Sequence, residues 1–425
     1  MALDFFPHRP ELLARLERIR AVGRLGQPLL LVGPEGAGKE TTALEFARRL
    51  NCVAPDACSA AAPCESCAKA ATFQHPDIRW IGPAPANFDE SRAAELLAAK
   101  VRNPFFQPHY ASTANVSIGD QENPGPMAVR SLIQFLQRRA FQGRVKVAVV
   151  ADSQRLNAAA GNAFLKTLEE PPADAIILLL ATETQGMLPT ILSRCQEIQV
   201  HPWPPDRLAA LLGDLTGCAP REAEDAARVA DGNARRAMAL LQDISPVVRE
   251  VAVTWGRWIL EGKRGSAAIL ADQMHRGAPP HFLSPAQAAV WKQHGKEGGG
   301  RRAADDDGGE SEGGGGGREA ASGSAVRRDL ANQLCEWLVL LYSEILRCRE
   351  WAGRWECRLP GAEDFIRAAA VARTTESLLA DVALIESARE DIDRNLNIGL
   401  LLAVLGEGLI DHAEKDQTRV RAARS

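Results

Sequence analysis

The chain has 425 residues, of which 46% are apolar, with a formal net charge of −4 and a pI of about 6.1. This length suggests about three domains with cores of their own, and the slightly negative charge argues against binding nucleic acid through bulk electrostatics. The first residues lack the basic flank and apolar core of a secretion signal, and no apolar run approaches the ~18 residues of a membrane span. We therefore expect a cytoplasmic protein with no membrane partner.

The first informative element is a glycine-rich loop at 33–39, between an apolar run at 29–32 and a stretch of helical spacing at 39–50. A phosphate-binding loop needs glycines that expose backbone N–H groups and a lysine that reaches the β and γ phosphates. These positions are filled by Gly33, Gly36, Gly38 and Lys39. Because a strand precedes the loop and a helix amino terminus follows it, the pattern favours a nucleotide-binding loop over an ordinary glycine-rich turn.

The residue after this loop departs from the pattern of a hydrolysing enzyme. Such a loop carries Ser or Thr at this position to hold Mg²⁺, whereas this chain carries Glu40. Either the adjacent Thr41 substitutes imperfectly, or the protein has the shape of an ATPase and does not hydrolyse ATP. A carboxylate opposes phosphate charge, so we expect ATP or ADP to bind weakly if at all, and Mg²⁺ not to bind.

Four of the nine cysteines cluster just after this first helix, at Cys52, Cys58, Cys64 and Cys67. Four thiolates can close a tetrahedral shell around Zn²⁺, and closed four-cysteine sites are structural. The residues between them are rich in Ala and Pro and lack an apolar pattern, so a metal would supply the folding energy of this loop. A redox pair or unbound thiols are the alternatives.

Two further segments precede the second informative strand. Residues 75–81 predict a strand entered from a turn, and 83–126 predict a long insertion or surface excursion around one helix near 90–101. A helix is predicted over 129–141, with Arg130, Arg138 and Arg139 on its polar side. Those cations either form a solvated face or contact DNA phosphates.

The apolar strand predicted at 146–150 ends in a second departure from hydrolysing enzymes. A P-loop ATPase places an acidic pair at such a strand end, to hold Mg²⁺ and orient the attacking water. This chain has Ala151 and Asp152 there. The metal side of the predicted site is therefore altered twice, at Glu40 and at Ala151.

The chain continues with motifs that together resemble one family. Two apolar strands are predicted at 175–180 and 197–200, and the motifs are Asn-Ala-Phe-Leu-Lys-Thr-Leu-Glu-Glu-Pro-Pro at 162–172 and Ser-Arg-Cys at 193–195. With the P-loop, the cysteine cluster and His-Pro-Asp at 75–77, they resemble the bacterial clamp-loader branch of the AAA+ family. The altered Glu40 and Ala151 make the chain most similar to the non-hydrolysing members of that branch.

The resemblance implies roles for several residues. Arg194 matches the arginine finger that stabilises transition-state charge on a nucleotide bound by a neighbouring subunit. Arg235 matches a second sensor that would reach the γ-phosphate, although a surface role at a helix start is equally compatible with the sequence. Thr182 or Thr184 would lie at the nucleotide-sensing strand end, or act only as turn residues.

The remaining sequence predicts helices. A small helical lid is expected over 203–243, and a helical collar domain for oligomerisation over 244–415, which contains an insertion at 295–324 expected to be disordered. The last helix is expected to begin near Asp391, and 416–425 are expected to form a loose basic tail.

The predicted architecture is therefore α/β plus all-α: an AAA+ P-loop domain with a parallel sheet over 1–202, with its zinc insertion at 51–68, followed by the lid and the collar. The resemblance implies an accessory subunit of the DNA polymerase III holoenzyme without ATPase activity of its own. It would work with gamma/tau and delta clamp-loader subunits, act on the sliding clamp indirectly, and meet primed DNA within the complex. The alternatives are a hydrolysing gamma/tau-type ATPase, in which Thr41 and Asp152 rescue catalysis, and a zinc-bearing adaptor.

Overall fold

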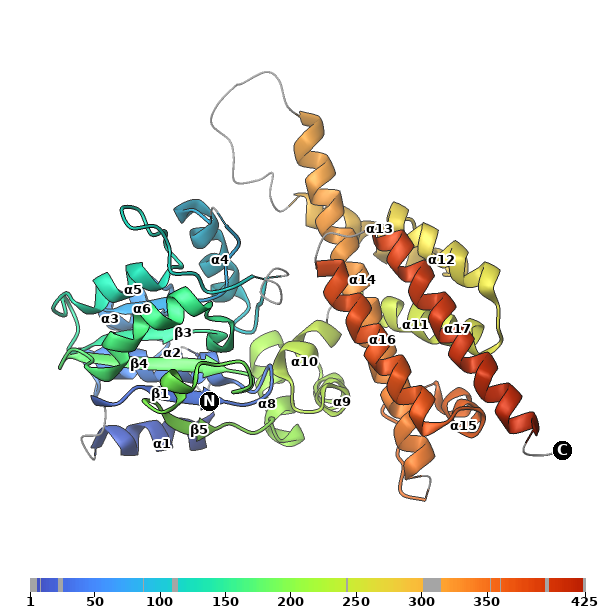
Figure 1. Cartoon of the computed structure of the whole chain (residues 1–425), viewed down its shortest axis with the longest axis horizontal. Coiled ribbons are helices and arrows are strands. Elements are labelled where there is room, and N and C mark those ends of the chain that lie inside the picture. Colours follow the sequence, from blue (N-terminus) through green and yellow to red (C-terminus); the bar gives the residue numbers. More distant parts are fainter. Residues whose placement is uncertain are drawn as a thin grey trace. The chain divides into compact units, whose positions relative to one another are not determined.

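A computed structural model describes residues 6–7, 9–21, 26–86, 88–108, 114–241, 244–300, 315–351, 353–359, 361–393 and 397–422 (Figure 1). The chain divides into two compact units, Met1–Met238 and Ala239–Ser425. None of the helices within these ranges is long and apolar enough to cross a membrane.

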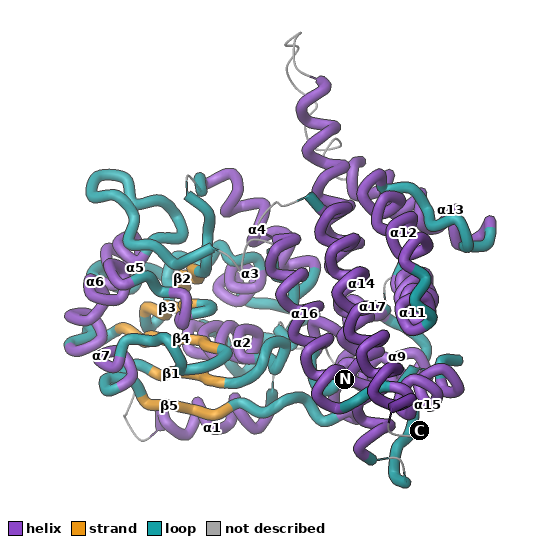
Figure 2. Tube along the Cα trace, turned by 45° about the vertical axis from the view of Figure 1, so that its right-hand side comes forward, coloured by secondary structure: helices purple, strands orange, loops and turns teal. Residues whose placement is uncertain are grey.

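The N-terminal unit is built on a five-stranded parallel sheet (Figure 2). Its strands, in spatial order, are β2 (Ile78–Ile81), β3 (Lys146–Val150), β4 (Ala175–Ala181), β1 (Leu29–Val32) and β5 (Gln196–Gln199). Every residue of β1, β3 and β4 is buried, because a parallel sheet is covered on both faces and its strands are continuous apolar runs. The predicted parallel α/β architecture is confirmed.

Helices cover this sheet and extend beyond its last strand. They are α1 (Pro10–Ala21), α2 (Lys39–Asn51), α3 (Glu65–Ala71), α4 (Glu90–Arg102), α5 (Val129–Leu136), the 3₁₀ turn η3 (Ser153–Arg155), α6 (Ala158–Glu169) and α7 (Pro189–Leu192). Helix α2 packs on β3 and β4, and α5 packs on β2 and β3. Beyond β5, the small helical lid consists of α8 (Pro205–Thr216), α9 (Pro220–Ala230) and α10 (Ala234–Leu240).

The stretch 83–126 is not the surface excursion that its polar composition predicts. Helix α4 buries Ala93, Leu96 and Lys100, which lie three and four residues apart and therefore on one face. Beyond the helix, Phe105 and Val116 are also buried. The segment is therefore packed into the N-terminal unit, and it contributes side chains to the site described below.

Helix α5 ends at Leu136, five residues before the predicted end, and the chain then turns around a buried carboxylate. Asp77 accepts backbone hydrogen bonds from Phe141 (2.7 Å), Gln142 (2.7 Å) and Gly143 (2.6 Å), and its carboxylate lies 2.8 Å from the ammonium of Lys146. Burial opposes ionisation of Asp77, but these donors outweigh it and lower its pKa to about 2. A helix continued to 141 would direct these amides to its own carbonyls.

The C-terminal unit is helical over its described ranges. Its helices are α11 (Ser245–Leu260), α12 (Arg264–Arg276), α13 (Pro285–Gly300), α14 (Gly315–Glu350), α15 (Glu363–Ala372), α16 (Thr375–Asp393) and α17 (Ile398–Ala422). Helix α14 packs against α11 and α16, and α17 packs against α12 and α16. Large apolar side chains such as Trp255, Leu338 and Tyr342 are buried between these helices.

Three predictions for this unit are corrected. Residues 295–300 and 315–324 are helical rather than disordered, since a helix already nucleated by an apolar face gains a hydrogen bond with each added residue; 301–314 lie outside the described residues. Asp391 lies near the end of α16, and the last helix begins at Ile398, where the side chain of Asn397 accepts from the Leu400 amide (3.1 Å). Residues 416–422 belong to α17 rather than to a loose tail.

The helical tail is held by a buried charge. Asp416, which is 1% exposed, accepts a hydrogen bond from the guanidinium of Arg373 at 2.9 Å. Arg373 also pairs with the buried Asp381, whose other oxygen lies 2.7 Å from Nδ1 of His412. Asp416 therefore faces inward, which a basic composition does not reveal.

Asp77→Asn is expected to lower the free energy of unfolding by about 3 kcal/mol at pH 7, because it leaves Lys146 buried without its counter-charge. A carboxyl group whose pKa is lowered on folding stabilises the protein above its unfolded pKa, near 4, and loses that contribution as the pH falls toward 2. Denaturant titrations of wild type and variant between pH 7 and pH 2 should therefore converge at the acid end. The exposed Asp174→Asn serves as the control, and an equal effect of both variants would contradict the assignment.

Candidate phosphate-binding and metal sites

The glycine-rich loop joins the carboxyl end of β1 to α2, and the lid holds it in place. Gly36 adopts a φ of +67°, which residues other than glycine rarely adopt. A Cβ at this position would lie 1.9 Å from Oδ1 of Asn233. The Gly36 carbonyl accepts hydrogen bonds from the Ala234 amide (3.1 Å) and from Nε1 of Trp203 (3.0 Å). The loop therefore has the predicted form, and α10 begins directly against it.

A pocket of about 100 Å³ lies over this loop, smaller than the roughly 300–1,000 Å³ of pockets that hold drug-sized ligands. The structure brings most of the predicted nucleotide-site residues together in its lining: Gly36, Gly38, Lys39, Glu40, Thr41, Asp152, Thr182 and Arg235. Gly33 lies behind it, and Thr184 is not part of the lining. The segment 104–108, which follows α4, closes one side.

Lys39 is turned toward the loop itself. Its ammonium donates to the carbonyls of Gly33 (2.6 Å) and Pro34 (2.8 Å). Burial lowers the pKa of Lys39 to about 8, against the opposing attraction of Asp152, Glu35 and Glu40. The cation that a phosphate-binding loop offers to its ligand is thus already engaged by backbone oxygens.

Glu40 forms an ion pair with Lys100 of α4. The ammonium nitrogen lies 2.7 Å from Oε1 of Glu40, donates to the Phe106 carbonyl (3.0 Å), and lies 4.8 Å from the centre of the Trp80 ring. Burial raises the pKa of Glu40, and the charge of Lys100 counteracts that rise. A protein cation therefore stands beside the residue that replaces the metal-binding hydroxyl.

Thr41 lines the pocket, but its hydroxyl is bonded to the backbone of its own helix turn. It is 1% exposed, and its hydroxyl donates to the Gly38 carbonyl at 3.3 Å, within the first turn of α2. Ala151 is buried at the end of β3 and offers no carboxylate. Both alterations recognised in the sequence therefore lie on the same side of one pocket.

Asp152 and Arg235 are linked across the pocket by Gln107. The amide nitrogen of Gln107 lies 3.3 Å from Oδ2 of Asp152, and its oxygen lies 2.7 Å from Nη1 of Arg235. The same Nη1 pairs with the carboxylate of Glu35, inside the phosphate loop. Burial raises the pKa of Asp152. Arg235 is therefore a pocket residue and not a solvated residue at a helix start.

Sequence reasoning missed Glu35, Lys100 and Gln107. Glu35 occupies a position of the loop pattern that accepts any residue, and Gln107 lies in an irregular segment, so neither gave a signal. Lys100 did give one, because it lies on the same helical face as the apolar Ala93 and Leu96. A lysine on an apolar face usually has a buried partner.

Arg194 lies at the opposite end of the strands from the phosphate loop. Its guanidinium pairs with the carboxylate of Glu169 and donates to the Thr190 carbonyl (2.8 Å), and the side chain is 31% exposed. Just beyond it, the Gln196 amide binds the Pro28 carbonyl at 2.8 Å, where β1 begins. Arg194 is therefore near the amino ends of β1 and β5, whereas the phosphate loop follows the carboxyl end of β1.

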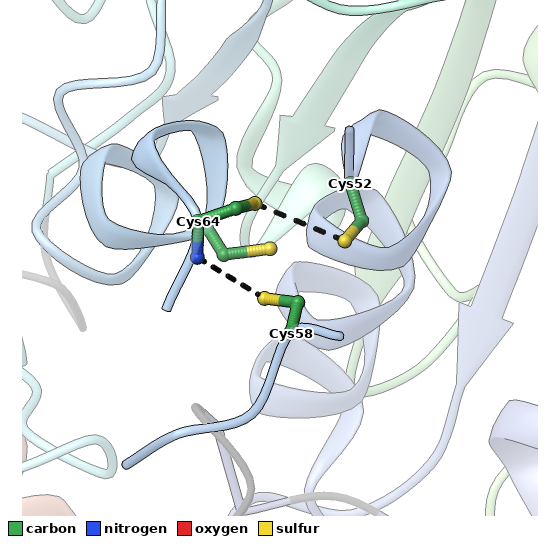
Figure 3. Close-up of side chains that lie close together, drawn as sticks. Cys52, Cys58 and Cys64 are labelled. Carbon is green, nitrogen blue, oxygen red and sulfur yellow. Dashed lines mark hydrogen bonds between the residues drawn. The ribbon is translucent and has the colours of Figure 1, made fainter. Parts of the chain in front are cut away.

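The four predicted cysteines form one cluster (Figure 3). All four sulfur atoms lie within 4.8 Å of one another, and Sγ of Cys52 is 3.9 Å from Sγ of Cys64. Sulfurs bound to one tetrahedral Zn²⁺ at about 2.3 Å would be about 3.8 Å apart. Cys52 directly follows α2, whereas Cys64 and Cys67 lie at the start of α3.

The surroundings of the cluster suit a bound cation held by thiolates. Nη1 of Arg48 lies 2.9 Å from Sγ of Cys67, and the Cys64 amide donates to Sγ of Cys58 at 3.3 Å. Burial raises the pKa of Cys52 and Cys67, whereas backbone N–H groups bring that of Cys64 to about 6 against the effect of burial. A metal ion would favour the thiolate form of all four, so the cluster could hold Zn²⁺ as a structural ion.

The fold and the pocket define a P-loop domain of the AAA+ type, and comparisons show which proteins it resembles. A family model described as DNA polymerase III, delta subunit, matches residues 8–204. The delta-prime subunit of Pseudomonas aeruginosa is 32% identical over 175 residues, which cover 41% of this chain and 43% of that protein. The matched part of the chain is thus similar to clamp-loader subunits of DNA polymerase III, and among them to delta-prime subunits.

Two further relatives show how the similarity is distributed. The delta-prime subunit of Escherichia coli is 27% identical over 282 residues, covering 64% of this chain and 72% of that protein. The gamma/tau subunit of Mycobacterium bovis is 28% identical over 244 residues, covering 55% of this chain and 36% of that protein. The chain thus spans about two fifths of the length of the Pseudomonas delta-prime subunit and of the Mycobacterium gamma/tau subunit.

Protein purified without added metal is expected to contain close to one equivalent of zinc, and its removal by a strong chelator should lower the melting temperature, because the metal replaces an apolar core in this loop. Elemental analysis and thermal melts measure both effects. Cys64→Ser should lose the metal, whereas Cys218→Ser, outside the cluster, should keep it. Well under one equivalent in the wild type would contradict the zinc assignment.

Proposed function

We propose that this protein is a clamp-loader subunit that does not hydrolyse ATP and that supplies Arg194 to the nucleotide of a neighbouring subunit. The neighbours would be gamma/tau and delta subunits, and the assembly would place a sliding clamp on primed DNA. The observation that carries the proposal is that the altered pocket lies at the carboxyl ends of the strands, whereas Arg194 lies at their amino ends.

The position of Arg194 supports action on a neighbour. Strand β1 has four residues and runs from the region of Arg194 to the phosphate loop. At ~3.3 Å per residue, it places the two ends of the strand at least ~10 Å apart. An arginine must contact the transferring phosphate directly to stabilise its charge, so Arg194 does not serve its own pocket. Its carboxylate partner Glu169 occupies the guanidinium in the way that a phosphate would.

The pocket supports the absence of hydrolysis. Hydrolysis needs a hydroxyl and a carboxylate on Mg²⁺ and an acid that orients water, and this pocket offers Glu40 and Ala151 at two of those positions. Thr41, which would have to substitute, is buried and bonded to Gly38. The cysteine cluster sits at the far end of α2 from the loop, so its zinc would act in folding and not in catalysis.

The gamma/tau-type ATPase is the second candidate, because the Mycobacterium bovis gamma/tau subunit, 28% identical over 244 residues, is about as similar to the chain as the Escherichia coli delta-prime subunit, 27% identical over 282. Purified protein with ATP and Mg²⁺ distinguishes the two. We expect no turnover above background, and turnover that Lys39→Ala abolishes would overturn the non-hydrolysing role in favour of the enzyme.

Arg194→Ala is expected to lower hydrolysis at the adjacent site by roughly 10³-fold, which is the typical contribution of an arginine finger. The measurement is single-turnover ATPase of the complex reconstituted with gamma/tau and delta subunits, clamp and primed DNA. Assembly of the complex is checked by gel filtration, so that a loss of hydrolysis is not caused by a loss of the complex.

Glu169→Ala is the matched control, since it breaks the same ion pair and leaves the arginine in place. A complex that contains this variant should hydrolyse ATP at nearly the wild-type rate. If both variants fall equally, Arg194 acts through the ion pair and not as a finger; if neither falls, the chain serves as an adaptor.

A further inference from the structure

The charged side chains of the phosphate pocket balance one another. Its lining contains three cations and three carboxylates: Lys39, Lys100, Arg235, Glu35, Glu40 and Asp152. Their formal charges sum to zero, whereas a phosphate site gains affinity from an excess of positive charge and free donors. The pocket therefore keeps the shape of a phosphate cradle without its attraction for an anion.

Each cation of this pocket also has an acceptor from the chain itself. Lys39 donates to two carbonyls of the loop, Lys100 pairs with Glu40 at 2.7 Å, and Arg235 pairs with Glu35. A guanidinium takes a carboxylate and a phosphate with the same planar set of donors. A phosphate entering the pocket would thus have to displace Glu35 from Arg235 and would meet Glu40 beside it.

Lys100 provides the other half of this arrangement. Its side chain is 5% exposed, and the Phe106 carbonyl and the Trp80 ring fix its position. Its ammonium supplies a positive charge next to Glu40, at the loop position where a hydrolysing enzyme holds Mg²⁺ by a hydroxyl. A divalent cation approaching Glu40 would be repelled by Lys100.

The contact between Glu35 and Arg235 joins two elements that are far apart in the chain. Glu35 belongs to the phosphate loop and Arg235 to α10 of the lid, and Gln107 connects the same guanidinium to Asp152. Side chains of the protein itself therefore connect the lid to the loop, at the position where a bound phosphate would otherwise contact both.

We propose that the carboxylate of Glu35 takes the place of a nucleotide phosphate on Arg235, so that the lid is held against the loop without ligand and the pocket excludes polyphosphates. This inference deepens the proposed function, because it explains how a subunit that does not hydrolyse ATP keeps one conformation while its neighbours exchange nucleotide. It concerns the chain alone and can fail independently of Arg194.

Two variants that break the same ion pair separate this inference from simple loosening of the lid. Glu35→Ala leaves the pocket with one excess positive charge and a guanidinium without its carboxylate partner, and Arg235→Ala leaves one excess negative charge. Binding of sodium tripolyphosphate and of ATP, each with and without Mg²⁺, is measured by calorimetry on the full chain. Glu35→Gln serves as an isosteric second variant, and Asp225→Ala, which breaks an exposed ion pair with Arg228 on α9, is the control.

Wild type, Arg235→Ala and Asp225→Ala are expected to bind tripolyphosphate more weakly than about 1 mM, and Glu35→Ala and Glu35→Gln at least roughly tenfold tighter, the effect of one hydrogen bond between charged groups. Tight binding by the wild type, no gain in either Glu35 variant, or an equal gain in Arg235→Ala would each overturn the inference. None of these results would alter the outcome expected for Arg194, which is measured on a neighbour's nucleotide.

Discussion

The parallel register of the sheet is the constraint on which the rest of the N-terminal unit depends. β1 lies between β4 and β5, all three run in the same direction, and every residue of β1 is paired on both sides. Segments that follow a strand therefore lie at the carboxyl ends of the strands, and segments that precede a strand lie at the amino ends. The phosphate loop and Asp152 meet at the carboxyl ends, and Arg194 lies at the amino ends.

A second layer of organisation comes from buried polar groups that tie irregular segments to the sheet. Asp77 binds three amides of the turn before β3, and Asn51, at the end of α2, accepts from the amides of Arg144 (2.9 Å) and Val145 (3.2 Å). Ser66 of the cysteine segment donates to the Asn51 carbonyl at 2.7 Å and lies 2.9 Å from His75. The cysteine cluster is thus attached to the same network that fixes the entrance to β2 and β3.

Local patterns predicted the parts of this architecture that depend on local physics. The strands at 29–32 and 146–150 were predicted to the residue, because a continuous apolar run bounded by polar residues has few other solutions. The clustering of the four cysteines and the loop between β1 and α2 were also predicted, since both follow from the spacing of a few residues along the chain. The end of α5 was not, because three amides bind a carboxylate 64 to 66 residues earlier in the chain.

The same distinction holds for the phosphate pocket. Glu40 and Ala151 were recognised as alterations because the pattern specifies what should stand there. Lys100, which pairs with Glu40, and Gln107, which is bonded to Asp152 and Arg235, both come from the segment 83–126, and only the folded chain shows that they reach the pocket. At the far end of the chain, the inward position of Asp416 depends on Arg373, and composition alone suggested a free tail.

The ion pair between Glu40 and Lys100 also affects how this protein can change over time. Replacing Glu40 alone by the hydroxyl residue of an active loop would leave a buried ammonium with no counter-charge, and replacing Lys100 alone would leave a carboxylate in the same position; each change costs several kcal/mol. If the pocket does not hydrolyse ATP, as proposed, a hydrolysing variant would need both positions changed together, in segments sixty residues apart, besides a carboxylate at position 151. The ion pair therefore makes single substitutions an unfavourable route to an active pocket.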